Sequence, residues 1–321
     1  MSEKITRRDF IKKTGTITAL ALSGISISNA EDKGKTDIPK RILGRTGVKV
    51  STLALGMGPI GINRLQPDAE KLVNLCIDLG INYIDVAPIY GDGEEKLSSI
   101  MKQRRKEVFL VTKVEEINKD SALRQINESL KKMQTDYIDA VHLHDFGGLD
   151  SGVVLGKNGA LEGLLEAQRL GLIKFIGISG HQKPMNFLKA LETGKIDLVM
   201  PAMNFVDRHT YNFEEKVLPE AIKQKTGIAC MKVLGGAVGM QYDKPMPALL
   251  LEEHYSYAIR YALGLKDVAT VVIGLKNEDE IRKAVDTVKS YKPLSDEEKV
   301  KINEIGKDLT KQWGAHFGPI V

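Results

Sequence analysis

The amino-acid sequence predicts a single (β/α)8 TIM barrel with an N-terminal β-hairpin and an extra C-terminal helix and tail. Short apolar runs rich in β-branched residues alternate with helical patterns between residues 52 and 289, and each kind occurs eight times. Polar side chains follow several of these runs, at the strand ends where parallel α/β folds place their chemistry. No internal repeat or low-complexity linker indicates a second domain, so we expect one domain over residues 31–321.

Each strand is predicted from a continuous apolar run, as expected for strands that are buried on both faces. The expected strands lie near residues 52–56, 82–86, 108–113, 137–144, 173–179, 196–200, 227–232 and 269–274. Each helix is predicted from apolar residues that recur every three or four positions. The expected helices lie near residues 68–79, 93–104, 120–133, 159–170, 183–193, 213–225, 247–263 and 277–289.

The chain before and after these units supplies the hairpin and the last helix. Glycines punctuate an apolar-polar alternation over residues 40–50, which predicts a small β-hairpin. A final helical pattern over residues 295–310 precedes a glycine-containing tail with Trp313, His316 and Phe317.

A doubly wound open sheet is the competing fold. It would carry a Gly-x-Gly-x-x-Gly loop after the first strand and then a helix. Residues 56–61 match this bare pattern, but Pro59 and residues 63–67 give no sign of a helix start. The sequence therefore favours the closed barrel.

Residues 1–30 resemble a twin-arginine signal peptide rather than part of the barrel. Residues 6–12 carry the paired arginines, an apolar run follows over 14–28, and Ser-Asn-Ala at 28–30 has the small-x-small pattern of a cleavage site. The run is too short for a stable membrane span. We expect export of the folded protein to the periplasm through the twin-arginine (Tat) translocase. The alternatives are a membrane anchor left by an uncleaved signal and a cytoplasmic protein with a basic tail.

The composition argues against a nucleic-acid partner and against a disulfide-stabilised fold. The whole chain carries a formal charge of +4, but its first 30 residues hold five basic and two acidic side chains, so the remainder is near neutral. No basic cluster with interleaved aromatic residues occurs. Cys76 and Cys230 fall in apolar helix and strand patterns, so we expect two buried thiols.

Ionisable side chains follow three consecutive expected strands. Asp85 lies at the end of the first, Tyr90 just beyond it, Lys113 at the end of the second and His144 at the end of the third. The carboxyl ends of neighbouring parallel strands meet at one rim, so these side chains are expected to converge. A tyrosine with an ordinary pKa of about 10 needs a nearby cation to transfer protons near neutral pH, and a lysine would supply it. The pattern predicts a proton-transfer site.

Three stretches of this sequence strongly resemble the aldo-keto reductases. They are Ile-Asp-Val-Ala-Pro-Ile-Tyr-Gly, Val-Thr-Lys, and Ser-Leu-Lys-Lys-Met-Gln-Thr-Asp-Tyr-Ile-Asp-Ala-Val-His-Leu-His. The resemblance runs from about Arg41 to about Val288. It implies an NAD(P)-dependent oxidoreductase that interconverts the carbonyl group of an aldehyde, ketone or sugar with an alcohol by hydride transfer.

The resemblance also implies a catalytic tetrad. Tyr90 would be the general acid that protonates the carbonyl oxygen. Lys113, held by Asp85, would lower the pKa of this phenol by favouring the phenolate. His144 would hydrogen-bond the substrate oxygen and align it.

The same resemblance places nicotinamide contacts at the ends of the fifth to seventh strands, where this sequence departs from the family. Ser179 matches the serine that holds the carboxamide, but Gly180 replaces the asparagine that usually follows. Met200 replaces the usual glutamine, and Asn204 lies four residues later. Met231 stands where an aromatic ring often stacks on the nicotinamide, and its polarizable side chain can cover a ring face.

Phosphate contacts are expected after the seventh and eighth strands. The first of these loops, with Leu234 and Gly236, offers consecutive backbone N–H groups to a pyrophosphate. The second loop, with Gly274 and Asn277, leads into a helix whose N-terminus favours anions.

The choice between NADP(H) and NAD(H) depends on the second loop. Lys276 matches the family position that pairs with the 2′-phosphate of NADP, so NADP(H) is favoured. Glu280 occupies a position that is usually Gln or Arg, and its carboxylate disfavours a phosphate. Ala284 replaces the asparagine that usually contacts the adenine.

Two other classes of function remain as alternatives. The first is a cofactor-binding sensor or subunit module with little turnover. The second is a metal-dependent barrel hydrolase that uses His142 and His144, for which Asp145 and His181 are the nearby candidates for further ligands. Lys113 would place a cation against such a metal, so we expect no metal.

Overall fold

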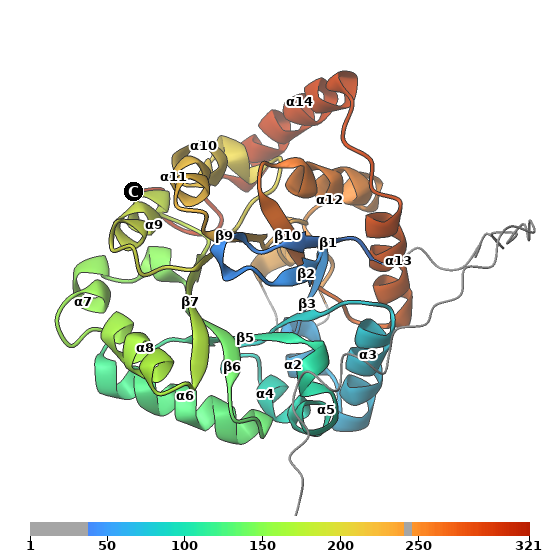
Figure 1. Cartoon of the computed structure of the whole chain (residues 1–321). Helices are drawn as coiled ribbons and strands as arrows, with labels where there is room; N and C mark the ends of the chain where they lie inside the picture. The colour runs from blue at the N-terminus through green and yellow to red at the C-terminus, as the bar shows by residue number, and fades with distance from the viewer. Residues whose placement is uncertain (1–37, 241–245) are drawn as a thin grey trace, which may run out of the picture. The chain divides into compact units, whose positions relative to one another are not determined.

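The computed structural model describes residues 38–240 and 246–321, and residues 36–321 form one compact unit. Eight parallel strands close into a barrel in the order β10-β3-β4-β5-β6-β7-β8-β9, and helices surround it (Figure 1). The strands are β3 (Leu53–Gly56), β4 (Tyr83–Asp85), β5 (Phe109–Val114), β6 (Ile138–Leu143), β7 (Ile173–Gly180), β8 (Leu198–Pro201), β9 (Gly227–Cys230) and β10 (Val268–Gly274). The predicted TIM barrel is confirmed. The expected signal segment and its boundary at residue 30 lie outside the described residues.

The helices follow the predicted order with three corrections, one of which is a short helix over Ser151–Leu155 where none was expected. They are α2 (Gly58–Asn63), α3 (Gln66–Asp78), α4 (Gly93–Lys96), α5 (Ser98–Arg104), α6 (Lys119–Met133), α7 (Ser151–Leu155), α8 (Ala160–Arg169), α9 (Pro184–Glu192), α10 (Phe213–Lys216), α11 (Leu218–Lys223), α12 (Tyr255–Gly264), α13 (Glu278–Lys289) and α14 (Asp296–Trp313). The first correction is α2, since the sequence indicated no helix after the first barrel strand. Pro59 lies in the first turn of α2, where its missing N–H costs no hydrogen bond.

The second correction is the start of α12, which was expected near residue 247. The segment before it pairs with the loop after β9: Val238 N donates to Pro247 O at 3.0 Å and Leu249 N donates to Gly236 O at 2.9 Å. These backbone groups form hydrogen bonds between two loops and are not available for helical hydrogen bonds. The helix therefore begins at Tyr255.

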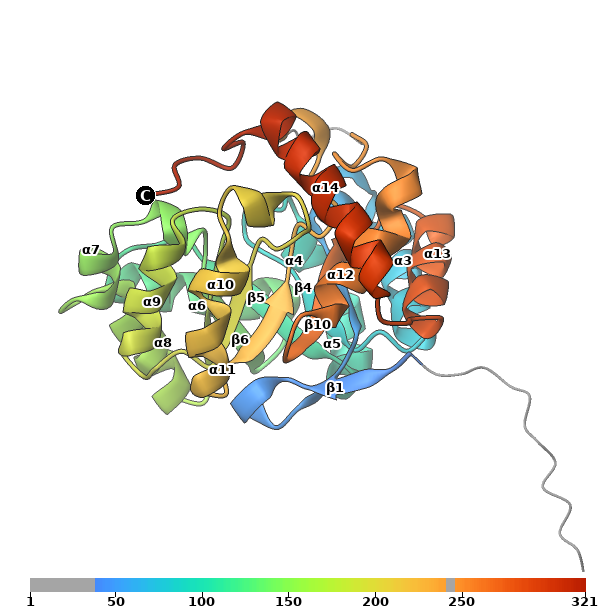
Figure 2. The same ribbon diagram turned by 90° about the horizontal axis from the view of Figure 1, so that it is seen from above.

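The N-terminal hairpin closes one end of the barrel. Strands β1 (Lys40–Ile42) and β2 (Lys49–Ser51) pair antiparallel, and the fully buried side chains of Leu43 and Val50 join the barrel-interior cluster. Gly44 is left-handed at φ 48°, and a Cβ at this position would collide with the Gly227 backbone. Figures 1 and 2 show this hairpin across the barrel, at the opposite end from the C-terminal tail.

The last helix carries the chain to the other end of the barrel, as Figure 2 shows. Ser295 and Glu298 form a capping box at the start of α14. Gly306 lies so close to the Phe205 carbonyl that a Cβ would collide with it. Beyond the helix, His316 Nε2 lies 2.9 Å from Asp207 Oδ1 and fixes the tail to the segment after β8.

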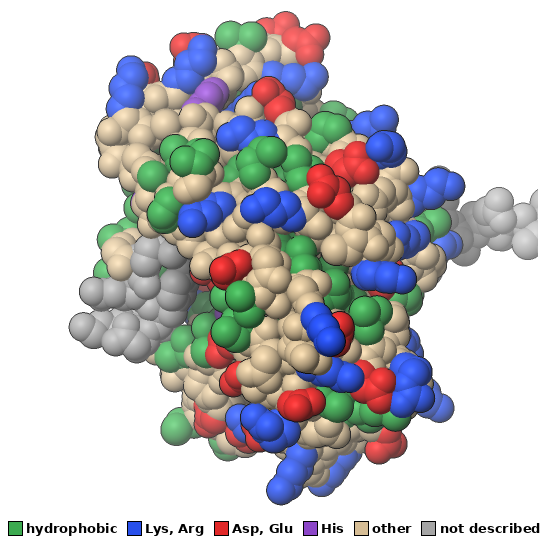
Figure 3. All heavy atoms as spheres, turned by 90° about the vertical axis from the view of Figure 1, so that its left-hand side faces the viewer, with side chains coloured by type: hydrophobic (Ala, Val, Ile, Leu, Met, Phe, Trp, Pro, Cys, Tyr) green, Lys and Arg blue, Asp and Glu red, His purple; other side chains and the backbone are tan. Residues whose placement is uncertain are grey.

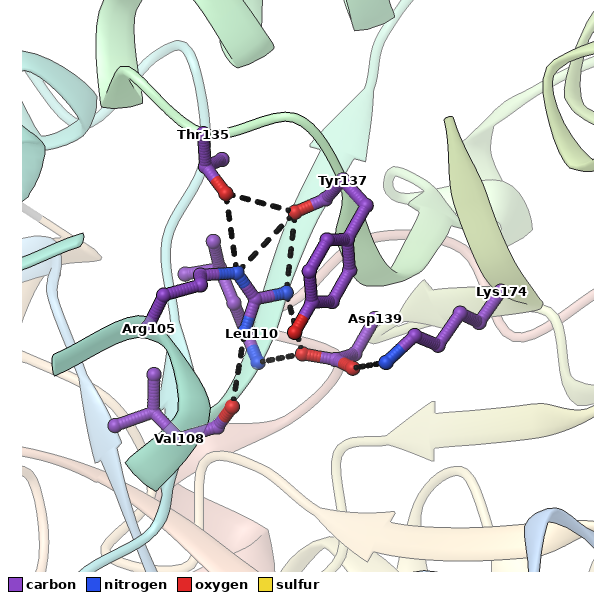
Figure 4. A network of polar contacts seen from close by, with 7 residues as sticks. All are labelled: Arg105, Val108, Leu110, Thr135, Tyr137, Asp139 and Lys174. Carbon is purple, nitrogen blue, oxygen red and sulfur yellow. Dashed lines mark hydrogen bonds and ion pairs between the residues drawn. The ribbon is translucent and has the colours of Figure 1, made fainter. Parts of the chain in front are cut away.

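A buried ion-pair network ties three strands together at their amino ends (Figure 4). Asp139 accepts hydrogen bonds from Arg105 Nη2 at 2.7 Å, from Lys174 Nζ at 2.9 Å and from the Leu110 amide at 2.9 Å. The Arg105 guanidinium lies 3.9 Å from the ring centroid of Tyr137. Charged groups far from the predicted rim thus stabilise the barrel rather than take part in chemistry.

The face of the molecule drawn in Figure 3 shows basic and acidic side chains interspersed rather than gathered by sign. Among the helices that the structure describes, none combines the length and the apolar character needed to cross a membrane.

Candidate active site

A buried ion pair lies at the carboxyl ends of β4 and β5. Lys113 Nζ donates to Asp85 Oδ1 at 2.9 Å, to Asp85 Oδ2 at 2.7 Å and to the Val86 carbonyl at 2.9 Å. The two side chains are 1 % and 4 % exposed. Burial opposes the ammonium charge, but the Asp85 carboxylate and Tyr90 outweigh it, so the pKa of Lys113 is raised. Lys113 is therefore a fixed cation at the rim.

Tyr90 lies on the turn after β4, with its ring centroid 4.7 Å from Lys113 Nζ. Helix α2 supports this turn, because a Cβ on Gly61 would lie 2.5 Å from the Tyr90 carbonyl oxygen. Gly91 has a left-handed φ of 60° and takes the chain away from the tyrosine. The ammonium can stabilise a phenolate on Tyr90, which is the requirement for proton transfer by a phenol.

His144 follows β6 and faces the same tyrosine. The two ring centroids are 6.3 Å apart and the rings are nearly perpendicular. Burial lowers the pKa of His144, although Glu115 works in the opposite direction, so the imidazole is neutral near pH 7. The four predicted catalytic residues therefore converge at one rim.

Glu115 is a site residue that the sequence did not indicate. Its Oε1 lies 3.0 Å from His144 Nδ1. Strands β5 and β6 pair Val114 with Leu143. Glu115 and His144 are the next residues on the two strands, so they lie opposite each other at the rim. This register is the signal that could have revealed the Glu115–His144 pair.

The two other histidines considered as metal ligands are buried or already paired. His142 is fully buried against Gly177, and burial lowers its pKa to about 3. His181 Nδ1 lies 3.2 Å from Asp145 Oδ1, and burial lowers the pKa of His181 to about 4. Across the described part of the chain, no group of three or more His, Cys, Asp or Glu side chains is arranged to hold a metal ion.

The predicted nicotinamide residues differ in how freely they can bind a ligand. Ser179 Oγ is buried at the end of β7 and has no hydrogen-bond partner among the described residues, which suits a ligand amide. Met231 and Met200 are buried in the barrel interior. Asn204 is already saturated: its Nδ2 donates to Asp207 and to the Lys232 carbonyl, and its Oδ1 accepts two backbone N–H groups.

The predicted pyrophosphate loop is shaped by left-handed glycines. Gly235 and Gly236 have φ of 79° and 85°, and the Trp313 ring packs on Gly235 so closely that no Cβ fits. The Leu234 carbonyl accepts a hydrogen bond from the Leu250 amide at 3.1 Å. The loop is thus held between the end of α14 and the segment before α12.

The predicted 2′-phosphate site contains its own carboxylate. Lys276 Nζ donates to the Met246 carbonyl at 2.8 Å and lies 4.0 Å from Glu280 Oε1. Glu280 Oε2 also accepts a hydrogen bond from the Lys276 amide at 2.8 Å, and Asn277 caps α13. Gly274 packs against Pro59 of α2. Acidic residues fill the first turn of α13, which opposes an anion there.

Comparison with known proteins decides the family. The model of the aldo/keto reductase family matches residues 52–248, a span that contains the whole tetrad. The chain belongs to the aldo-keto reductase family. It is 25% identical to the L-galactose dehydrogenase of Arabidopsis thaliana over 88% of this chain and 99% of that protein. It is 27% identical to the D-arabinose 1-dehydrogenase of Saccharomyces cerevisiae over 77% of this chain and 85% of that protein.

Solved structures agree on the fold. The holo form of an aldo-keto reductase from Bacillus halodurans matches with a TM-score of 0.69 at 24% identity, covering 84% of this chain and 97% of that one. As a member of the aldo-keto reductase family, this chain is an oxidoreductase, and the cofactor of this family is NAD(P)H. When bound, the nicotinamide donates or accepts a hydride. Ser179 and the loop around Gly236 are the residues whose free polar groups and backbone shape fit such a group.

Proposed function

We propose that the chain interconverts a carbonyl compound and its alcohol, with Tyr90 as the general acid and base. The observation that carries this proposal is the buried Lys113–Asp85 pair beside the Tyr90 ring. In reduction, Tyr90 gives its hydroxyl proton to the substrate oxygen and the ammonium stabilises the resulting phenolate. In oxidation, the phenolate takes the proton from the substrate hydroxyl. Aspartate holds the lysine in place and does not exchange protons with substrate.

We propose that the substrate is a sugar. Two relatives that match most of this chain act on L-galactose and D-arabinose by their names. The rim next to Tyr90 and His144 also carries the Asp145–His181 pair, which can hydrogen-bond hydroxyl groups.

For the cofactor we propose NADP(H), on the strength of Lys276. Glu280 opposes this choice, because a carboxylate 4.0 Å from the lysine competes with a 2′-phosphate and can instead accept a hydrogen bond from a ribose 2′-hydroxyl. The proposed preference thus depends on the balance of these two side chains.

The test of the reaction is Tyr90→Phe, with Tyr257→Phe on α12 as the matched control. The Tyr90 variant should bind cofactor as the wild type does, measured by fluorescence quenching, and lose at least about 10²-fold in turnover, the size typical of general acid catalysis. Turnover of the Tyr90→Phe variant within a few-fold of wild type would show that Tyr90 is not the general acid and base. Wild-type protein that binds cofactor and turns over no aldehyde, ketone or sugar would instead favour the sensor or subunit module.

Export through the twin-arginine translocase is a further part of the proposal, and it rests on the sequence of residues 6–30. Periplasm is the proposed location, with a membrane anchor as the alternative. Fractionation of cells that express the full chain separates the two, because an uncleaved signal would leave the protein in the membrane fraction.

A further inference from the structure

Glu94 and Lys96 lie just after Tyr90 and are buried, although the proposed reaction uses neither of them. Both belong to α4, and they are 1% and 2% exposed. Glutamate and lysine side chains are rarely buried this deeply unless other groups hold them. Their hydrogen-bond partners belong to α2 and β5, which both lie next to the tyrosine.

Lys96 joins α4 to α2. Its Nζ donates to the Gly61 carbonyl at 2.5 Å and to the Asp92 carboxylate. Gly61 also packs closely on the Tyr90 carbonyl, and the two helices lie side by side in Figure 1. Helix α2, the turn that carries Tyr90 and α4 therefore form one packed unit.

The turn at Tyr90 runs directly into α4. Gly93 N donates to the Tyr90 carbonyl at 3.0 Å, and Lys96 N donates to the Asp92 carbonyl at 3.0 Å. A Cβ on Gly93 would lie 3.3 Å from Val86 Cγ2, so the turn is also packed against the end of β4. Because the turn is short and closely packed, a displacement of α4 moves Tyr90 with it.

Glu94 joins this unit to β5. Thr112 Oγ1 donates to Glu94 Oε1 at 2.7 Å, and the Thr112 side chain is fully buried. Thr112 directly precedes Lys113, whose Nζ lies 4.7 Å from the Tyr90 ring centroid. Neighbouring side chains on a strand point to opposite faces, so Glu94 reaches β5 from the side away from the Lys113 ammonium. This hydrogen bond ties the unit that carries the tyrosine to the strand that carries the cation.

We infer that Glu94 is a positioning residue that holds Tyr90 at its working distance from Lys113 through the Thr112 hydroxyl. This inference rests on the proposed function for the role of Tyr90 and adds a condition to it. The ammonium stabilises the phenolate less as the two groups separate, because the energy of a charge pair falls with distance. Proton transfer by Tyr90 therefore depends on a side chain that does not contact Lys113 itself.

The tyrosine is observed without turnover in the full-length protein labelled with 13Cζ-tyrosine, with Tyr90→Phe to identify its signal. Thr112→Val removes the hydrogen bond without a change of charge and should raise the midpoint of the Tyr90 titration by about half a pH unit or more. Glu94→Leu should raise it as well. Loss of a nearby negative charge alone would lower this midpoint, so the sign of the shift separates positioning from charge.

Two matched variants complete the titration. Glu94→Gln keeps an amide oxygen that accepts the Thr112 hydroxyl, and burial raises the pKa of Glu94, which favours the neutral form that glutamine imitates. Glu95→Leu removes the neighbouring carboxylate, which is more exposed and pairs with Lys132 at 3.2 Å. Neither variant should raise the midpoint.

Turnover per bound cofactor is the second measurement. Thr112→Val and Glu94→Leu should lower kcat about tenfold or more and change KM and the cofactor dissociation constant less than about twofold, because only the reacting group is displaced. Glu94→Gln should keep kcat within about threefold of wild type.

Thr112→Val is the deciding variant, because valine is close to threonine in shape and the fold does not depend on Glu94→Leu being stable. A midpoint that does not rise in Thr112→Val overturns the inference, and so does an unchanged kcat in that variant. A lower midpoint in Glu94→Leu also overturns it, since charge alone then explains the effect. If the wild type turns over no compound, the proposed function fails, and the tyrosine titration alone decides the inference.

Discussion

At the scale of single residues, the proposed preference for NADP(H) depends on Lys276 and Glu280. The lysine would attract a 2′-phosphate, but it already contacts the Met246 carbonyl, and the glutamate lies 4.0 Å from its ammonium. Two unit charges at this distance interact by about 1 kcal/mol in a water-like medium and by more near a protein surface. A 2′-phosphate that pairs with Lys276 would lie near the Glu280 carboxylate, and a repulsion of this order would change the binding constant measurably.

We expect Glu280→Gln to tighten NADP binding about fivefold or more and to change NAD binding less than twofold. The amide oxygen of glutamine still accepts the Lys276 N–H, so the loop keeps its shape. Glu278→Gln is the control, because Glu278 lies in the same turn but pairs with Arg282. Isothermal titration calorimetry with NADP and with NAD measures the two dissociation constants and so their ratio. Equal changes for NADP and NAD would show that Glu280 does not face the 2′ position.

At the scale of elements, Asp139 joins the loop before β5 to the strands β6 and β7. Asp139→Ala leaves the Arg105 guanidinium without its carboxylate, and removal of one partner of a buried pair costs about 3–5 kcal/mol. Lys174→Met should cost less than about 1 kcal/mol, because the Lys174 side chain is 50% exposed. Urea unfolding gives both values. A loss of unfolding free energy in Lys174→Met as large as that in Asp139→Ala would contradict the prediction that the buried Arg105–Asp139 pair contributes more than the exposed lysine.

The elements also show why the sequence predicted some features and missed others. Barrel strands are buried on both faces and read as apolar runs, so all eight were found. Residues 247–251 are apolar enough for a helix, but residues 247–250 pair with the loop after β9. Local periodicity contains no information on that partner. The convergence of the four predicted catalytic side chains was predictable because strand ends meet at one rim. Glu115 was not, because adjacent acidic residues after a strand also fit a solvated loop.

At the scale of the whole molecule, acid should destabilise the fold through its buried histidines. His142 has a pKa of about 3 in the folded protein, against 6.5 for an ordinary histidine. Between these values the unfolded chain binds a proton that the folded chain does not, so stability falls as pH decreases. One such histidine contributes about 1.4 kcal/mol per pH unit.

We expect His142→Asn to reduce the slope of unfolding free energy between pH 4 and 6 by about this amount. His181, with a pKa of about 4, keeps its own contribution in that variant. Urea unfolding at a series of pH values measures the slope. Above pH 8 the slopes of variant and wild type should coincide, since both states are then neutral at this position. An unchanged slope at acid pH would mean that the buried imidazole gains its proton without unfolding.

If the protein is exported in the folded state, as proposed, it can bind its cofactor before it leaves the cytoplasm. Cys76 and Cys230 are free and buried, and burial raises the pKa of the Cys76 thiol to about 12, so a reducing cytoplasm suffices for folding. A protein that crosses folded can carry a nucleotide with it, and the loop held by Trp313 would slow its release. We expect periplasmic protein to contain nucleotide after denaturation, and Arg7→Lys/Arg8→Lys to leave the protein in the cytoplasm. Empty periplasmic protein that exchanges added cofactor within milliseconds would contradict retention.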